Sequence, residues 1–500
     1  MKKSKLLMAS LLASVFALGL SSCTNRQTLL FLNWGEYIDE DILEAFEEKY
    51  NCNVSMDLGD SNEIFYSMVK AGTTVYDVVC PSDYMVEKMY SAGLLQEIDF
   101  SKLTMSGYNP NTEEGKDSMR KGVLAILDEM NTNLKASNPK YVDNTIQNYF
   151  VPYLWGTWGI MYSTYDETKV KEEDRARSFA FYKDLEKAVT QNSNQWASLF
   201  DRSSLPNGTK VAMYDSYQHL YYAACHYLEK ENPLSNNYGI ELPQSDLNII
   251  KDLIYNMDYN AWGTDNIKKD IKGGNYQVGF MWTGDFLYYY CEKAAEVAVN
   301  AYMAGDVTMD NMANMVGELC DSSDRIYEAN GKKYTIGFDF FIPDDTIAFC
   351  DNLVIPKDAS NVDLAHKFID FMSSYSTSAS LDEDGNEIDP DTLEEDEILT
   401  PCYNNTYYVC YDAWNNTVFD DLVALKDDSI FTKEAKETFD EEIQSLAKED
   451  TELYGLLYDY VTGIAFDKYY EKDVVKGQIL ASFSQDYIDQ IFTAFNNART

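Results

Sequence analysis

Aromatic rings and carboxylates occur together where several short apolar segments of this chain end. Two such groups stand early in the sequence: Trp34, Glu36 and Tyr37 in the stretch NWGEY, and Ser82, Asp83 and Tyr84 in the stretch PSDY. A ring face attracts a cation, and a carboxylate accepts charge-assisted hydrogen bonds from an ammonium group. The combination is typical of a site for an organic amine whose methylene groups pack on the rings.

Three later segments carry the same combination of residue types. They are Asp215 with Gln218 three residues after it, Trp282 and Asp285 in MWTGD, and Phe349 and Asp351 in AFCDN. Structural roles are also open, because an aspartate at a strand end can cap the next helix and a tryptophan can pack in a core. Asp351 is the hardest to explain in that way, because it interrupts an apolar strand and a buried carboxylate needs a partner.

The segments that carry the first two groups alternate between strand and helix patterns. Strands are expected over 28–34, 53–59 and 76–82, and amphipathic helices over 39–50, 61–72 and 83–93. Asp39 and Ser61 are the expected N-caps, and Ser82 could cap the third helix. Repeated strand–helix–strand units predict an α/β fold with a parallel sheet, in which ligands bind beyond the carboxyl ends of the strands.

The second half of the chain repeats this pattern. One strand ends at Asp215, another runs over Val278–Trp282, and a third lies within Ile347–Ala359 before an amphipathic helix over 361–375. Two α/β domains that face each other across a cleft are therefore predicted. Three segments interrupt the pattern and are interpreted as insertions, at 300–336, 381–397 and 415–470.

The charge of the chain restricts its partners. Its 83 acidic and 40 basic residues give a formal net charge of −43, which argues against nucleic acid because phosphates require Lys and Arg. A negative field concentrates cations near a cleft and so fits a cationic ligand. A solvated acidic surface without any ligand would have the same composition, so charge alone does not decide between them.

The N-terminus has the features of an export signal. The basic stretch MKKSK precedes an apolar stretch, Leu6–Leu20, that is short for a membrane-spanning helix, and LSSC then ends in Cys23. This end resembles the lipobox of bacterial lipoproteins. The resemblance implies removal of residues 1–22, lipid on the Cys23 thiol, and an anchored protein at the outer face of the cytoplasmic membrane or in the periplasm. A plain secretory signal with an incidental cysteine is the alternative.

Motifs for catalysis and for metal binding are absent from the sequence. It has three histidines, with no H-E-x-x-H, no G-x-S-x-G and no phosphate-binding loop, and segment 381–397 lacks the spacing of an EF-hand. We expect no cofactor, no metal and no enzyme activity. Paired acids leave a surface glycosidase open, and the insertions leave a lipoprotein adhesin open. Cys80 is expected to be buried, and a disulfide between Cys402 and Cys410 is possible in an exported protein.

Taken in order, the motifs resemble the substrate-binding proteins of spermidine/putrescine ABC transporters. The resemblance rests on LNWGEYI, on the block from SNEIFYSMVKAG to SDYMVEKMYSAGLLQEID, on VPYLWGTWGI, on MWTGD and on FCDNLVIPKDA. It implies a type II periplasmic-binding-protein fold, with two α/β lobes joined by crossovers and a hinge that closes on the ligand. The expected lobes are 28–155 with 350–400, and 156–349 with 401–500.

The resemblance also implies a role for each site residue. Aromatic walls are expected from Trp34, Tyr37, Trp282 and Phe349. Acids near the amines are expected at Glu36, Asp215, Asp285 and Asp351. Polar contacts are expected from Ser82 and Tyr84, beside Asp83 in the same turn.

Three positions depart from the family pattern. Gly35 replaces a Ser or Thr, Gln218 stands where an acid is expected, and no Tyr directly precedes Thr400 and Pro401. These departures leave the identity of the amine open between spermidine and putrescine. We therefore expect a monomeric lipoprotein that captures a polyamine and delivers it to an ABC permease. A binding protein of the same fold for an amino acid, an opine or a sugar is the alternative.

Overall fold

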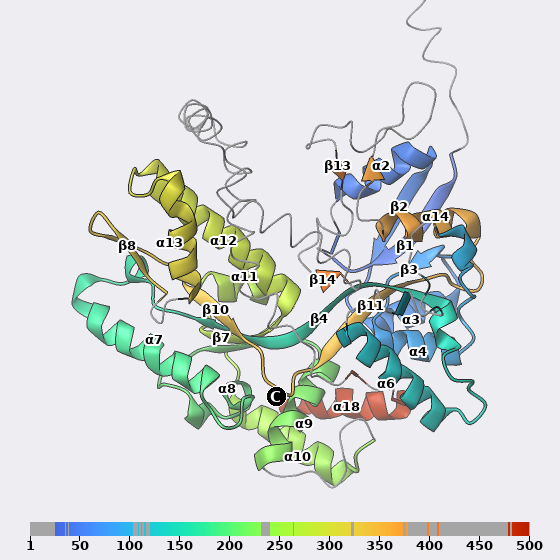
Figure 1. Cartoon of the computed structure of the whole chain (residues 1–500). Helices are drawn as coiled ribbons and strands as arrows, with labels where there is room; N and C mark the ends of the chain where they lie inside the picture. Colours follow the sequence, from blue (N-terminus) through green and yellow to red (C-terminus); the bar gives the residue numbers. More distant parts are fainter. Residues whose placement is uncertain are drawn as a thin grey trace, which may run out of the picture.

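In the computed structural model of this chain, two α/β lobes are joined by long strands that pass between them (Figure 1). Lobe 1 is formed by the elements before residue 150 together with β11 and α14, and lobe 2 by the elements between residues 164 and 341. The structure describes residues 26–35, 37–38, 40–103, 109, 112, 115–116, 121–231, 241–263, 265–321, 325–373, 377–378, 398–399, 408–409, 479–480 and 483–499.

Lobe 1 alternates strands and helices along the chain as expected. Its elements are β1 (Thr28–Asn33), α2 (Glu40–Tyr50), β2 (Asn53–Leu58), α3 (Asn62–Ala71), β3 (Val78–Val79), α4 (Asp83–Ser91), η1 (Phe100–Lys102), α6 (Lys121–Ser137), η2 (Ile146–Tyr149), β11 (Ala348–Val354) and α14 (Val362–Met372).

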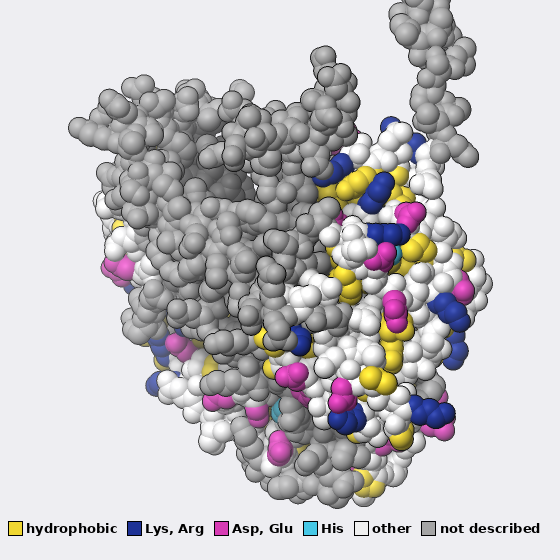
Figure 2. Space-filling view, turned by 45° about the vertical axis from the view of Figure 1, so that its right-hand side comes forward, with side chains coloured by type: hydrophobic (Ala, Val, Ile, Leu, Met, Phe, Trp, Pro, Cys, Tyr) yellow, Lys and Arg dark blue, Asp and Glu magenta, His cyan; other side chains and the backbone are white. Residues whose placement is uncertain are grey.

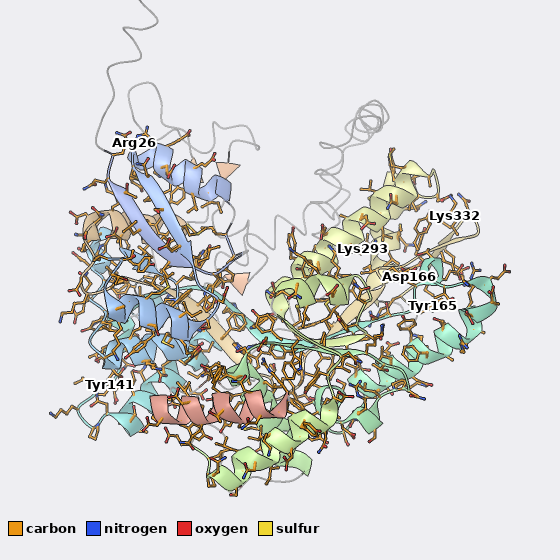
Figure 3. All side chains as sticks on the ribbon, turned by 180° about the vertical axis from the view of Figure 1, so that it is seen from behind. Arg26, Tyr141, Tyr165, Asp166, Lys293 and Lys332 are labelled. Atoms are coloured by element: carbon orange, nitrogen blue, oxygen red, sulfur yellow. The ribbon has the colours of Figure 1, made fainter. Side chains whose placement is uncertain are left out.

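Lobe 2 follows the crossover strand β4 (Phe150–Ser163). Its elements are η3 (Glu167–Lys169), η4 (Glu172–Asp174), α7 (Arg175–Thr190), α8 (Ala197–Phe200), η5 (Arg202–Ser204), β5 (Val211–Tyr214), α9 (Tyr217–Glu231), α10 (Gln244–Met257), β6 (Ala261–Gly263), α11 (Asp265–Lys272), β7 (Val278–Trp282), α12 (Thr283–Met303), α13 (Met309–Asp321), β8 (Tyr327–Ala329), β9 (Lys332–Tyr334) and β10 (Phe338–Phe341). Seen from behind, Arg26 and Tyr141 lie on lobe 1, and Tyr165, Asp166, Lys293 and Lys332 lie on lobe 2 (Figure 3).

One sheet runs through both lobes in the order β2-β1-β3-β11-β4-β7-β5-β6, with β10 and β14 (Tyr408–Val409) also paired to β4. Strand β1 is parallel to β2 and β3, and β5 is parallel to β6 and β7, as the strand–helix repeats predict. The sheet also contains a strand that the strand–helix repeats did not address, β11, which is antiparallel to both β3 and β4. The reason is that β4 and β11 are the two crossovers and run between the lobes in opposite directions. The mixed sheet is that of the type II periplasmic-binding-protein fold, which confirms the predicted fold class.

Local sequence explains the elements that carry the site. Ser61 caps α3 as expected, because its hydroxyl accepts the Ile64 N–H at 3.3 Å, and Gly72 ends the helix at a φ of 62°. Ser82 precedes α4 but makes no cap hydrogen bond with its side chain. Its hydroxyl is therefore available for another partner. The expected cap Asp39 lies outside the described residues.

The crossover strand β4 connects the two lobes through the sheet. All of its residues are buried, and its first half pairs with β11 while its second half pairs with β7 and β10. A strand buried on both faces is expected to be largely apolar, as β4 is apart from the buried Thr157 and Ser163.

The C-terminal helix α18 (Gln485–Ala498) also connects the two lobes. It packs against α9 and α10 of lobe 2 (Figure 1). Just before it, the Ile479 N–H donates to Glu129 of α6 in lobe 1 at 3.3 Å. The end of the chain is thus a third link between the lobes.

The predicted insertions have different outcomes. Segment 300–336 contains the end of α12, helix α13 and the hairpin β8–β9, so it adds regular structure to lobe 2. Segments 381–397 and 415–470 lie outside the described residues, as do Cys402, Cys410 and the leader with Cys23. Two further short strands, β12 (Thr377–Ser378) and β13 (Ile398–Leu399), pair with each other. Cys80 is fully buried, as expected.

Acidic and basic side chains are interspersed over the described surface of lobe 1 that Figure 2 shows. No helix within the described part of the chain is long and apolar enough to cross a bilayer.

Candidate functional site

A cavity of about 400 Å³ opens between the lobes, where the expected strand ends meet. Lobe 1 contributes the turns after β1 and β2, the start of α4, and β11. Lobe 2 contributes the ends of β5 and β7 with the starts of α9 and α12, and one side chain from α11. The predicted site residues that line it are Trp34, Tyr37, Ser82, Asp83, Tyr84, Trp282, Asp285, Phe349 and Asp351.

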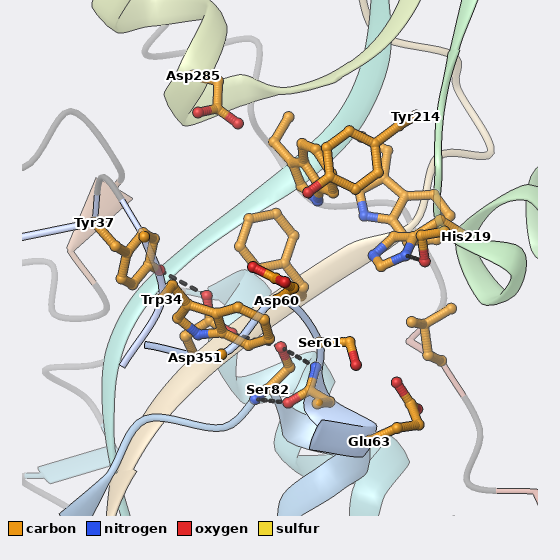
Figure 4. Close-up of a pocket in the computed structure, with 18 of the residues that line it drawn as sticks. Trp34, Tyr37, Asp60, Ser61, Glu63, Ser82, Tyr214, His219, Asp285 and Asp351 are labelled. Atoms are coloured by element: carbon orange, nitrogen blue, oxygen red, sulfur yellow. Dashed lines mark hydrogen bonds between the residues drawn. The ribbon is translucent and has the colours of Figure 1, made fainter. Parts of the chain in front are cut away.

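Two hydroxyl groups bind the carboxylate of Asp351 in the cavity (Figure 4). The Tyr37 hydroxyl donates to its Oδ2 at 2.6 Å and the Ser82 hydroxyl donates to its Oδ1 at 2.6 Å. Asn62 positions Ser82, because it accepts the Ser82 N–H and donates to the Ser82 hydroxyl, both at 3.0 Å. Burial raises the pKa of Asp351 to about 6, and the two hydroxyl donors oppose that rise. The carboxylate is therefore largely ionised at neutral pH, and its hydrogen-bond partners among the described residues are neutral.

Trp34 forms an aromatic wall beside Asp351 (Figure 4). Its ring is half-buried and packs on Phe65, with centroids 4.4 Å apart. Its indole N–H is buried and has no hydrogen-bond partner among the described residues. A buried donor without a partner is costly, so this N–H is available to a ligand acceptor or a bound water.

Asp83 lines the same cavity but makes structural bonds. Its carboxylate accepts the Tyr84 N–H at 2.6 Å and the Cys350 N–H at 2.8 Å, which ties α4 to β11. Burial raises the pKa of Asp83 to about 8, although both backbone donors lower it. The residue thus positions Asp351 and the rest of β11.

Two acids that sequence reasoning missed also line the cavity, Asp60 and Glu63 (Figure 4). The Tyr84 hydroxyl donates to Glu63 at 3.2 Å, and burial raises the pKa of Glu63 above its usual value. A signal was present in the sequence, because GDSNE follows β2 at a strand end just as NWGEY follows β1. Lobe 1 therefore brings four acids, Asp60, Glu63, Asp83 and Asp351, to one cavity.

Lobe 2 contributes an aromatic box with an acid. The rings of Tyr214 and Trp282 meet edge to face with centroids 4.4 Å apart. Asp285, in the first turn of α12, accepts a hydrogen bond at 3.0 Å from Lys268 of α11. The Lys268 ammonium lies 5.1 Å from the Trp282 ring centroid and 5.9 Å from that of Tyr214. A lysine of the chain thus has the cation–π and carboxylate contacts that were expected for a ligand amine. Lys268 was not predicted, because nothing local marks it.

His219 also lines the cavity in lobe 2. Its ring packs against Trp158 and Trp282, and its Nδ1 lies 2.5 Å from the Ser216 hydroxyl. Burial lowers the pKa of His219 to about 3, so the ring is neutral at pH 7. No group of three or more metal-ligating side chains occurs among the residues that the structure describes. The described lining of the cavity thus combines acids, hydroxyls and aromatic rings with one ammonium, that of Lys268.

Two of the remaining predicted residues, Asp215 and Gln218, lie outside the cavity. Asp215 does not line the cavity and forms an ion pair with Arg499, whose guanidinium also lies 4.4 Å from the Trp262 ring centroid. Gln218 is buried away from the cavity, and its side-chain oxygen has no hydrogen-bond partner within the described part of the chain. Glu36 lies outside the described residues.

Comparison with known proteins identified one matching protein family. The family is described as "Hypothetical lipoprotein (MG045 family)", and its model matches residues 1–473. The match therefore covers nearly the whole chain, including the N-terminal segment.

Curated relatives of the chain are periplasmic binding proteins. The chain is 26% identical over 372 residues to the putrescine-binding periplasmic protein SpuD of Pseudomonas aeruginosa, covering 74% of this chain and 79% of that protein. It is 25% identical over 350 residues to the putrescine-binding periplasmic protein PotF of Escherichia coli, covering 69% and 73%. Among solved structures, the spermidine/putrescine ABC transporter substrate-binding protein PotD of Streptococcus pneumoniae is 19% identical, with a TM-score of 0.47 and coverage of 95% and 98%.

Proposed function

Because the chain belongs to the MG045 family of hypothetical lipoproteins, we propose that it is an extracytoplasmic solute-binding protein for a polyamine. It captures spermidine or putrescine in the cavity between its lobes and delivers the ligand to an ABC permease. The relatives named above are binding proteins for putrescine by their names, which supports this substrate class. No covalent chemistry is part of the proposed function.

The observation that carries the proposal is the Asp351 carboxylate at the floor of the cavity. It is buried, its hydrogen-bond donors Tyr37 and Ser82 are neutral, and the Trp34 ring stands beside it. An ammonium group in the cavity would gain a charge-assisted hydrogen bond from the acid and a cation–π contact from the ring. The cavity volume of about 400 Å³ is within the range of small-molecule sites.

Capture of the ligand would involve closure of the two lobes around it. Both lobes contribute residues to the lining of the cavity, and β4 and β11 cross between them. A ligand that touches both lobes favours the arrangement in which they are closed. We place the lobes at 28–155 with 350–400 and at 156–349 with 401–500, with the crossovers as the hinge.

The lipid anchor is part of the proposal and has its own test. Cleavage before Cys23 and acylation of its thiol would tether the mature chain to the membrane, because a lipid-modified terminus holds a protein at the bilayer surface. Labelling of cells with a radioactive fatty acid should mark the wild-type protein and leave Cys23→Ser unmarked. Equal labelling of both would refute the anchor at this residue.

One observation favours a second candidate, a binding protein of the same fold for an amino acid. The ammonium of Lys268 lies in the cavity, and an ammonium is the natural partner of a ligand carboxylate. An amino acid with a terminal amine would then bind Asp351 at one end and Lys268 at the other.

Calorimetric titration of residues 24–500 tests the proposed function. Putrescine, spermidine and spermine are titrated separately, with lysine and sodium chloride as controls. We expect saturable one-to-one binding of at least one polyamine, and weak or no binding of lysine. Weak, salt-sensitive heat from every cation would show only the acidic surface and would refute the polyamine function.

A further inference from the structure

We propose that Lys268 is an internal competitor for the second ammonium position of the cavity and so determines how the protein ranks diamines against monoamines. The inference rests on the proposed amine-binding function and adds the residue that sets its specificity. Its basis is the juxtaposition of the Lys268 ammonium with Asp285, Trp282 and Tyr214, the groups that would hold a ligand amine on lobe 2.

The contacts of Lys268 are those of a bound cation. Its Nζ donates to Asp285 Oδ1 at 3.0 Å, and both side chains are largely buried, with 10% and 13% of their surface exposed. Its ammonium also lies within cation–π distance of two rings. Charge-assisted hydrogen bonds in a partly desolvated site are stronger than those at the surface, so a ligand ammonium must compete with a well-held group.

The helix that carries Lys268 is fixed by core packing, whereas the lysine side chain itself is long and flexible. On the same helix, Ile267 and Ile271 are buried in the core of lobe 2, which holds α11 in place. Lysine carries its charge on a flexible four-carbon stem. Ligand binding would therefore displace the ammonium of Lys268 without moving α11.

Sharing of Asp285 between the two cations would also oppose binding. The Oδ2 atom of Asp285 is buried and has no hydrogen-bond partner among the described residues, so it is the acceptor left for a ligand. An ammonium at that atom would lie close to the ammonium of Lys268, and like charges at short range repel. Displacement and sharing thus both cost free energy because of Lys268.

The lobe 1 end of the cavity is different. Asp351 is hydrogen-bonded by the neutral hydroxyls of Tyr37 and Ser82, and no ion pair of Asp351 occurs among the described residues. One end of the cavity is therefore open to an ammonium, and the other already holds one. This asymmetry predicts that the first amine of a ligand contributes more to affinity than the second.

Three ligands that share a four-carbon chain and one ammonium separate the possibilities. Putrescine ends in a second ammonium, butylamine in a methyl group and 4-aminobutanoate in a carboxylate. The mature chain is titrated calorimetrically with each, as wild type, as Lys268→Gln and as Lys269→Gln. The last variant is the matched control, because Lys269 is the exposed neighbour and its substitution changes the net charge equally.

We expect Lys268→Gln to bind putrescine about tenfold more tightly than wild type. The reason is that the ligand ammonium no longer has to replace the charged hydrogen bond between Lys268 and Asp285. Butylamine affinity should change by less than about twofold, and Lys269→Gln should resemble wild type with all three ligands. In Lys268→Gln/Asp285→Asn the gain for putrescine should disappear, because the acid that Lys268 masks is then absent. Thermal unfolding of each variant verifies that it is folded.

Several outcomes would overturn the inference. Unchanged or weaker putrescine binding in Lys268→Gln would show that Lys268 does not compete with the ligand. Tighter binding of 4-aminobutanoate than of putrescine by wild type, lost in Lys268→Gln, would make Lys268 a contact for a ligand carboxylate. Absence of binding by any amine to wild type and variants would overturn the proposed polyamine function as well.

Discussion

Asp351 is an acid within a strand that is buried along its whole length. Every residue of β11 is buried, and an ionised acid at such a position is costly unless it has partners. Tyr37 and Ser82 come from the ends of two other strands and supply hydroxyl donors, not opposing charges. The cost of burial is thereby reduced while the negative charge stays available, which is the condition for binding a cation.

Removal of this charge should weaken ligand binding without unfolding the protein. Asp351→Asn keeps the shape of the side chain, and loss of a charged hydrogen-bond partner should weaken polyamine binding by about 2 kcal/mol, about 30-fold. Calorimetric titration measures the change. Asp363→Asn is the control, because this exposed acid on α14 carries the same charge far from the cavity. An unchanged affinity in Asp351→Asn would remove Asp351 from the site.

The raised pKa of Asp351 predicts a pH dependence of binding. Burial raises this pKa to about 6, so the carboxyl group is protonated below that pH and loses its charge. Between pH 7 and pH 6 the dissociation constant should rise about twofold, and well below pH 6 it should rise about tenfold for each pH unit. Titrations at pH 5, 6 and 7 test this. Asp351→Asn should lack this dependence, and a dependence retained in the variant would assign it to Glu63 or Asp83, the other cavity acids whose pKa values are raised.

At the scale of elements, β4 has to pass between neighbours on both sides. Two of its glycines lie where a side chain would clash. A Cβ at Gly156 would lie 2.7 Å from the Thr283 hydroxyl, and one at Gly159 would lie 2.3 Å from the Phe340 ring and 2.7 Å from the Phe341 carbonyl oxygen. Neighbouring side chains, and at Gly159 also the β10 backbone, therefore occupy the space that a Cβ would need, which explains the two glycines of the WGTWG stretch.

Substitution at the tighter of these glycines should destabilise the fold. Gly159→Ala should lower the free energy of unfolding by about 1–3 kcal/mol, because the added methyl group forces β10 away from β4. The midpoint of denaturant unfolding measures the change. Gly317→Ala on α13 is the control, since no atom lies within 4 Å of its added Cβ and alanine favours a helix by about 1 kcal/mol. Equal effects of the two substitutions would contradict the packing argument.

At the scale of the whole molecule, the cavity has walls from two lobes, and in the described part of the chain three segments connect them. The crossovers β4 and β11 pass through the sheet, and the segment before α18 binds Glu129 of lobe 1. Arg499, at the end of α18, pairs with Asp215 of lobe 2. Closure on a ligand would have to bend all three connections, which makes the relative position of the lobes the quantity that a ligand can shift.

Ligand binding should therefore stabilise and compact the molecule together. A polyamine at about 100 times its dissociation constant should add about 2.7 kcal/mol to the free energy of unfolding and raise the melting temperature. Small-angle scattering should show a smaller radius of gyration in the same sample. Asp351→Asn at the same ligand concentration should show much smaller changes. A raised melting temperature with an unchanged radius would indicate a rigid site in place of a hinge.

Local patterns in the sequence were sufficient for much of the fold. The strand over Val278–Trp282, the Ser61 cap and the alternation of strands and helices were predicted correctly, because each depends on neighbouring residues and on the fixed periods of strand and helix. The meeting of Trp34 and Ser82 at one cavity could also be anticipated, since parallel strands of one sheet present their carboxyl ends at a common edge. Asp351 joins them from the middle of the antiparallel strand β11, a position that only the family resemblance implied.

Only the tertiary structure decided which charges meet across the chain. Lys268 reaches Asp285 because α11 packs beside the end of β7, and Arg499 reaches Asp215 across 284 positions of sequence. Asp60 and Glu63 enter the cavity through the turn after β2, and β11 runs antiparallel to its neighbours because it returns between the lobes. These contacts depend on how whole elements dock, and no local period or spacing records such docking. The elements and the acidic, aromatic character of the site could therefore be inferred from the sequence, whereas the charge balance of the cavity required the fold.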